Sequence, residues 1–174
     1  MMETQPQPSV TSVAVKYGLL TALVGVVYSL IIMVADLGDN RILSSLAYLI
    51  LIGGIVVAMK QYKAANFGYM SYGQGLGIGA IVSVIFGLLS GLFTWLYTEF
   101  VDTEYMARMM EKQREQMIQQ GLSDEQIDAG MKMAENFQGP VTMILGAGVI
   151  TLIIGFILSL IISAIMKNSR PEFE

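Results

Sequence analysis

Residues 141–166 read VTMILGAGVITLIIGFILSLIISAIM and contain no charged side chain. A helix of this length rises about 39 Å at 1.5 Å per residue, which is more than the ~30 Å hydrocarbon core of a bilayer. The stretch therefore predicts a membrane-spanning helix that tilts or projects beyond the membrane. Gly139 and Pro140 stand directly before it, and proline is favoured in the first turn of a helix.

Three more long apolar stretches lie upstream, at residues 15–34, 42–59 and 74–97, and Lys16, at the edge of the first, is their one charged side chain. Charged side chains make up 14 % of the 174 residues, whereas ordinary soluble domains carry about 25 %. The first apolar run also exceeds the core of a cleaved signal peptide, which is about 7–15 residues long. The pattern predicts an all-α integral membrane protein with four transmembrane helices.

These spans define the expected organisation of the chain. Residues 15–166 form a four-span membrane domain, which residues 1–14 precede as a polar tail and residues 167–174 follow as a C-terminal tail. Residues 98–140 join the third and fourth spans. A structureless loop of this length is uncommon in a compact domain, so we expect this connection to have secondary structure of its own.

Helix signals occur throughout this long connection. Asp102 suits the start of a helix, because a carboxylate interacts favourably with the positive end of the helix dipole. Gly121 suits a helix exit, and Ser123 with Gln126 forms a capping-box pattern at the start of a second helix. We therefore expect a helical hairpin over residues 98–140, called the arm below.

Apolar residues of the arm recur at intervals of three, four and seven, which gives each helix one apolar stripe. Each stripe needs a covering surface: the other helix, the membrane or a partner. Methionine thioethers would also suit Cu(I), but methionine more often fills an apolar face, and no Cys or His supports a metal site. The second helix is expected to end near Phe137, and the residues expected to dock are Met109, Met110, Ile127 and Met131.

Small residues recur at helical spacing in the third and fourth spans. Lipid gives little hydrophobic driving force between helices, so small side chains favour association by allowing close backbone approach. We expect the two spans to pack on each other within one subunit, and a homodimer interface remains the alternative. The residues expected to pack are Gly87, Gly91, Gly148, Gly155, Ser159 and Ser163.

The residue inventory excludes most catalytic and cofactor chemistry. The chain has no Cys and no His, which excludes a thiolate nucleophile, an imidazole base and a Cys/His zinc site. A net charge of −4 gives no reason to expect nucleic-acid binding. The spans carry no ionisable residue in their interior, which disfavours proton- or sodium-coupled transport. We expect no catalytic, cofactor-binding or metal-binding residue.

Lysine and arginine residues near span ends predict the orientation in the membrane. Five lie on the side of the two termini and five on the side of the arm, so the count alone is even. The first five lie close to helix ends, whereas nine acids accompany the four bases of the arm. We therefore expect both termini in the cytoplasm, with interfacial anchors at Lys60, Lys63, Tyr69, Trp95 and Tyr97.

Several short motifs carry a resemblance to a known family. Residues 69–75 read YMSYGQG, residues 95–97 read WLY and residues 100–102 read FVD. The arm contains QREQM and GLSDEQI, and the C-terminal tail contains PEF. From about Lys16 to its end, the chain resembles the small bacterial inner-membrane proteins catalogued as domain of unknown function four-one-nine-nine. The resemblance implies a multi-span protein of the bacterial inner membrane, mostly in the Bacteroidetes group. With both termini in the cytoplasm, as the basic residues predict, the arm would lie in the periplasm. The resemblance implies no activity.

The expected function is that of a non-enzymatic structural or accessory membrane protein whose acidic arm docks onto a partner or the membrane surface. The expected partners are membrane lipids, a second copy or an unidentified membrane protein. Two alternatives remain. One is a small channel or transport accessory subunit, and the other is an enzyme acting at the membrane interface.

Overall fold

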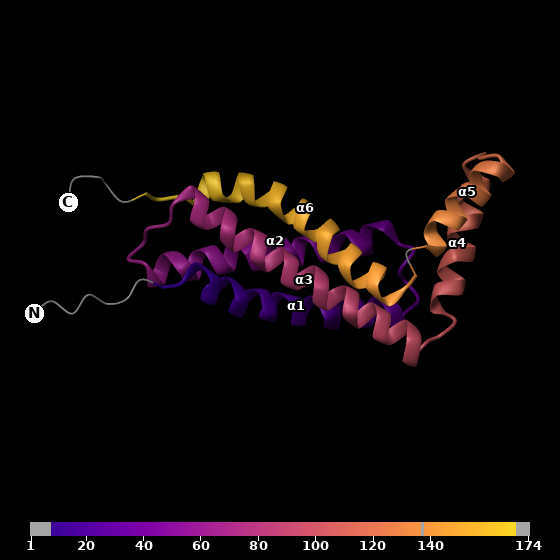
Figure 1. The fold of residues 1–174 in the computed structure, drawn as a ribbon, viewed down its shortest axis with the longest axis horizontal. Coiled ribbons are helices and arrows are strands. Elements are labelled where there is room, and N and C mark those ends of the chain that lie inside the picture. The colour runs from indigo at the N-terminus through magenta and orange to yellow at the C-terminus, as the bar shows by residue number, and fades with distance from the viewer. Residues whose placement is uncertain (1–7, 137, 170–174) are drawn as a thin grey trace, which may run out of the picture.

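The computed structural model describes residues 8–136 and 138–169. Phe137, residues 1–7 of the N-terminal tail and residues 170–174 of the C-terminal tail lie outside the described residues. The described part folds into helices, which run in the order α1 (Val10–Val34), α2 (Arg41–Ala65), α3 (Tyr72–Phe100), α4 (Tyr105–Gln119), α5 (Asp124–Glu135) and α6 (Pro140–Met166) (Figure 1).

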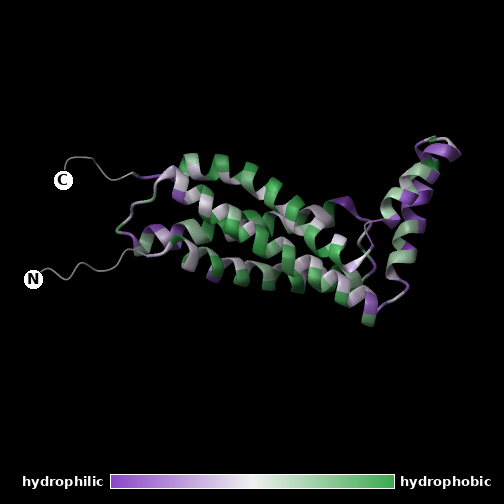
Figure 2. Ribbon diagram, in the orientation of Figure 1, coloured by the Kyte–Doolittle hydropathy of each residue, from purple (hydrophilic) through white to green (hydrophobic). Residues whose placement is uncertain are grey.

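Four of these helices, α1, α2, α3 and α6, are long and apolar enough to cross a membrane. The predicted fold class, an all-α membrane protein with four spanning helices, is therefore confirmed. Apolar residues cover the long helices, and hydrophilic residues gather toward α4, α5 and the helix ends (Figure 2). α3 is the central helix, because it packs against α1, α2 and α6. The core is fully buried at Ala22, Leu51, Ile55, Ile78 and Val82.

Four of the helices, α1, α2, α3 and α5, begin at a capping side chain. Ser71 forms a complete capping box with Gln74 at the start of α3, and Asn40 accepts hydrogen bonds from the first backbone N–H groups of α2. The apolar stretch at residues 42–59 continues as helix to Ala65. Lysine side chains mark a membrane boundary but do not end a helix, so α2 continues past its apolar part to Ala65. The chain then turns at Gly68, whose φ is +83°.

Both termini and the α2–α3 connection lie at one end of the bundle (Figure 1). Met70 and Asn168 form an antiparallel backbone bridge there, and the Lys63 ammonium donates to the Met166 carbonyl at 2.9 Å. These bonds join the end of α6 to the segment between α2 and α3. The other end carries α4 and α5, which lie across the bundle and turn at Gly121, where φ is +76°.

Candidate functional site

The closest helix contact in the bundle is the α3–α6 seam, formed by residues spaced four apart on each helix. A Cβ added to Gly79 would lie 2.5 Å from the Cβ of Ser159, and one added to Gly155 would lie 2.5 Å from the Cβ of Ser83. Gly75 faces Ser163 in the same way, at 2.9 Å. At these positions each hydroxyl side chain therefore lies against a glycine of the opposite helix.

The seam continues toward the arm through closer backbone contacts. A Cβ on Gly87 would lie 2.6 Å from the Ala147 carbonyl oxygen, and one on Gly91 would lie 2.8 Å from the Met143 carbonyl oxygen. A Cβ on Gly148 would lie 2.7 Å from the Leu88 side chain. The structure thus places all six residues expected to pack, from Gly87 to Ser163, between α3 and α6 of one subunit.

The seam also contains Gly75 and Gly79, which belong to the small-residue pattern of the third span, and two residues that were missed as candidates for packing: Ser83, and Thr151, which faces Gly87. The available signal was the four-residue spacing itself, which runs through Gly75, Gly79, Ser83, Gly87 and Gly91 along α3. Serine and threonine share this face with glycine because their hydroxyls can bond to their own helix. Ser83 donates to the Gly79 carbonyl at 2.7 Å.

The second feature is the junction between the arm and the α1–α2 turn. The Tyr105 ring, at the start of α4, is 7 % exposed and packs with Met33 of α1 and Tyr97 of α3. The Tyr97 and Tyr105 rings meet edge to face with centroids 6.1 Å apart. The Tyr105 hydroxyl also lies where a Cβ on Gly38 would be, so the absence of a side chain at Gly38 makes room for it.

Ion pairs surround this aromatic contact. Arg108 donates two hydrogen bonds to the Asp102 carboxylate, at 2.6 and 3.1 Å, and this pairing lowers the pKa of Asp102. Lys112 donates to Asp36 at 3.0 Å, and this hydrogen bond raises the pKa of Lys112. Burial, with the nearby Asp36 carboxylate, raises the pKa of the Tyr105 hydroxyl. The arm is thus joined to the α1–α2 turn by a tyrosine and a lysine of α4.

The residues expected to dock the arm face inward. Met109 packs beside the Tyr105 cluster, and the Met110 sulfur accepts a hydrogen bond from the Gln138 amide. Ile127 is only 4 % exposed, so the chain itself covers this side chain. Met131 is half-buried on α5. The large apolar side chains that the arm helices α4 and α5 expose are Ile118 at 57 % and Met133 at 65 %.

The expected interfacial anchors fall into different environments. Lys60 is exposed, while Trp95 and Tyr69 are half-buried. Lys63 is half-buried and bonded to α6, as described above. Tyr97 is 6 % exposed, so its predicted role as a lipid-facing anchor is corrected: the arm covers this tyrosine from outside the membrane domain.

Two cavities flank the junction. One, of about 220 Å³, is lined by Tyr28, Ser29 and Thr94 with Tyr105 at its edge. The other, of about 320 Å³, lies between α4 and the α1–α2 turn and is lined by Met106, Met109 and Met110 among others. Toward the termini, the bundle interior is filled by fully buried apolar residues.

Comparison with known proteins places this architecture in a family. The sequence model of one family, described as Protein of unknown function (DUF4199), matches residues 16–168. The chain belongs to this family. The DUF4199 match covers α1 from Lys16 on, the other three spanning helices in full and the whole arm, in agreement with the resemblance seen in the sequence motifs. No curated protein and no solved structure matches the chain.

Proposed function

We propose that this DUF4199 protein is a non-catalytic accessory protein of the bacterial inner membrane, which presents its arm to a partner protein in the periplasm. The observation that carries the proposal is the seating of α4 on the α1–α2 turn through Tyr105 and Lys112. These contacts hold the arm against the membrane domain and bury the apolar face of the arm that points toward that domain. It leaves Ile118 and Met133 exposed on a charged surface.

The partner should have a basic surface with an apolar contact at its centre. The arm segment, residues 98–140, holds nine acidic and four basic side chains. Interface cores are apolar and their rims are polar and charged, which matches exposed Ile118 and Met133 among carboxylates. Opposite charge on the partner would steer its approach and reject acidic competitors.

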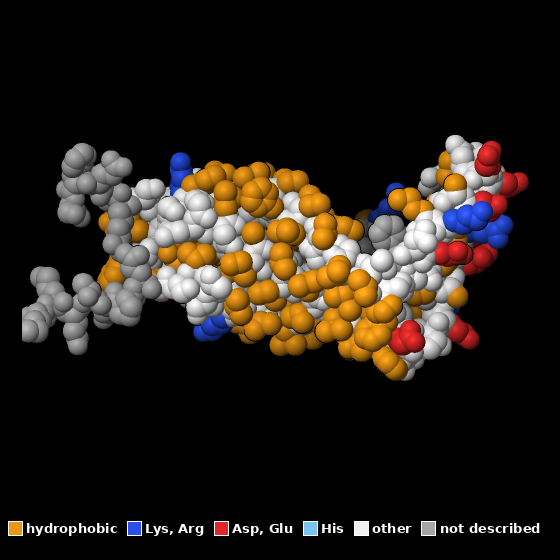
Figure 3. Space-filling model, viewed as in Figure 1, with side chains coloured by type: hydrophobic (Ala, Val, Ile, Leu, Met, Phe, Trp, Pro, Cys, Tyr) orange, Lys and Arg blue, Asp and Glu red, His pale blue; other side chains and the backbone are white. Residues whose placement is uncertain are grey.

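The distribution of charge supports a periplasmic arm. At the end that holds the termini, the described residues carry Lys16, Lys60, Lys63 and Lys167 and no acidic side chain. At the arm end, two of the five bases, Arg108 and Lys112, form ion pairs. Figure 3 shows charged side chains at both ends and an uncharged middle. Basic residues close to span ends are retained on the cytoplasmic side, and each of these four lysines lies within or directly after a spanning helix, which favours cytoplasmic termini.

The channel alternative is less well supported. The hydroxyl-lined cavity beside Tyr105 could hold water, but the apolar core below it, at Ala22, Leu51 and Val82, is fully buried. A pore through one subunit would require this core to open. An accessory role requires no such rearrangement.

Site-directed cross-linking tests the proposal. Gln119→Cys on the exposed end of α4 introduces the first thiol into the chain, and Gln61→Cys on α2 is its control at the opposite end. In intact spheroplasts, a membrane-impermeant maleimide should label Gln119→Cys and spare Gln61→Cys. The reverse pattern would overturn the proposed orientation.

The same cysteine then reports on the partner. A cross-linker on Gln119→Cys, in cells that encode the protein, should capture one stoichiometric polypeptide. Adding Ile118→Asp should abolish capture because it places a charge in the apolar contact, whereas Gln120→Glu should preserve it. Equal capture by both variants, or recovery of the protein alone, would overturn the proposed interaction.

A further inference from the structure

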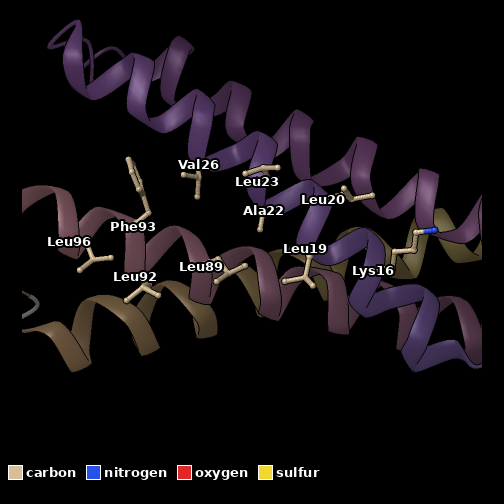
Figure 4. A pocket seen from close by; sticks show the side chains of 10 residues that line it. All are labelled: Lys16, Leu19, Leu20, Ala22, Leu23, Val26, Leu89, Leu92, Phe93 and Leu96. Carbon is tan, nitrogen blue, oxygen red and sulfur yellow. The ribbon is translucent and has the colours of Figure 1, made fainter.

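A long apolar groove runs between α1 and α3 on the outer surface of the bundle (Figure 4). Its volume is about 570 Å³, and its walls consist mainly of Leu19, Leu20 and Leu23 from α1 with Leu89, Leu92 and Leu96 from α3. Among its lining residues, Lys16 carries the one charged side chain. Lys16 lies at one end of the groove and Phe93 with Leu96 at the other (Figure 4).

The groove follows from how α1 meets α3. Gly18 and Gly25 on α1 lie against the side chains of Ile85 and Phe86 of α3, so the absence of a side chain at each glycine lets these side chains pack on the α1 backbone. Ala22, between the two glycines, is fully buried. The leucines flank this contact on its open side and line the groove from both helices (Figure 4).

The groove begins at Lys16, in the leaflet on the side of the termini, and extends past the middle of the bundle to Leu96, near the arm end of α3. From Lys16 to Val26 the helix rises about 15 Å, which is half of a ~30 Å hydrocarbon core. Lys16 lies on the side of the termini, since α1 begins at Val10. Its apolar stem can lie along the groove while the ammonium reaches the headgroup level. At this end of the described molecule, every charged side chain belongs to a lysine.

We propose that this groove binds an anionic phospholipid of the leaflet on the side of the termini, with one acyl chain between the leucine walls and the headgroup phosphate beside Lys16. An apolar groove does not hold ordered water, so within a membrane it is filled by a lipid chain or by another helix. A second helix needs small residues at its contact, and Gly18, Ala22 and Gly25 are already covered by α3. A lipid chain needs only an apolar wall.

Native mass spectrometry of the full-length protein tests the proposal. The protein is purified in mild detergent and equilibrated with equal amounts of dioleoyl phosphatidylglycerol and dioleoyl phosphatidylethanolamine. We expect one retained lipid per chain, with phosphatidylglycerol preferred about five-fold. Lys16→Gln should remove this preference, while Lys16→Arg and the control Lys60→Gln at the same end should keep it.

A second pair of variants separates the groove from the general lipid-facing surface. Leu23→Trp should fill the groove and abolish the retained lipid, whereas Ile157→Trp, exposed on α6 outside the groove, should leave it bound. A monodisperse elution profile for each variant shows that the fold is intact. The proposal is wrong if Lys16→Gln and Lys60→Gln behave alike, or if Leu23→Cys forms a disulfide-linked dimer, because the groove would then hold a second copy.

Discussion

Ser83 of α3 lies directly against Gly155 of α6, and the arrangement is repeated with the roles exchanged one turn away, where Ser159 of α6 lies against Gly79. Each serine donates a hydrogen bond to the glycine carbonyl four residues earlier in its own helix, at 2.7 Å for Ser83 and 2.6 Å for Ser159. Each hydroxyl is therefore hydrogen-bonded within its own helix, and close packing holds α3 against α6.

A first prediction concerns the glycines of this seam. Gly87→Ala should lower the free energy of unfolding in detergent by about 1–3 kcal/mol, because the added Cβ meets backbone atoms of α6. Gly146→Ala on α6 has open space around it and should raise stability by about 0.5–1 kcal/mol through helix propensity. Thermal unfolding midpoints measure both, and a Gly87→Ala variant as stable as Gly146→Ala would contradict the packing described.

A second prediction separates packing from hydrogen bonding. Ser83→Ala loses a bond that stays within α3, so stability should fall by less than about 1 kcal/mol. Ser83→Val places two methyl groups against Gly155 and should cost about 1–3 kcal/mol. Resistance to unfolding by sodium dodecyl sulfate compares the variants. A larger loss for alanine than for valine would show that the hydroxyl bond holds the seam.

A third prediction addresses the seating of the arm. Tyr105→Ala removes the ring that packs with Met33 and Tyr97, so α4 should detach from the α1–α2 turn while the spanning helices remain folded. Tryptic cleavage within α4 should accelerate at least about ten-fold, because local opening exposes the chain. Met133→Ala, on the exposed surface of α5, is the control and should leave the rate unchanged. Equal rates for the two variants would refute the seating.

A fourth prediction follows from the ion pair at the base of α4. Since Arg108 lowers the pKa of Asp102 in the folded arm, the pair stabilises the arm throughout the pH range above an ordinary aspartate pKa. The stabilisation is lost as the pH falls through the lowered pKa. A spin label at Thr103→Cys should remain immobile at neutral pH and become mobile only in strong acid. With Asp102→Asn it should be mobile at every pH, and an acid transition surviving in that variant would implicate another group.

The four spanning helices could be predicted from the sequence because a bilayer imposes its own constraint. Backbone N–H and C=O groups in the hydrocarbon core must form their hydrogen bonds within the same segment. A charge-free run that is long enough to cross the bilayer is therefore helical, whichever helices it packs against. Glycine spacing likewise marked Gly87 and Gly155 for close packing. Capping at Ser71 and Ser123 is a local effect and is visible in neighbouring residues.

Only the tertiary structure decided which of these residues meet. The match of Gly79 with Ser159 depends on the register of two helices about eighty positions apart in the sequence. The burial of Tyr97 and the pairing of Lys112 with Asp36 depend on where the arm rests, and that is set by a turn 76 residues away along the chain. Local sequence fixes whether a segment is helical and apolar, whereas contacts between distant segments depend on the shapes of both surfaces at once.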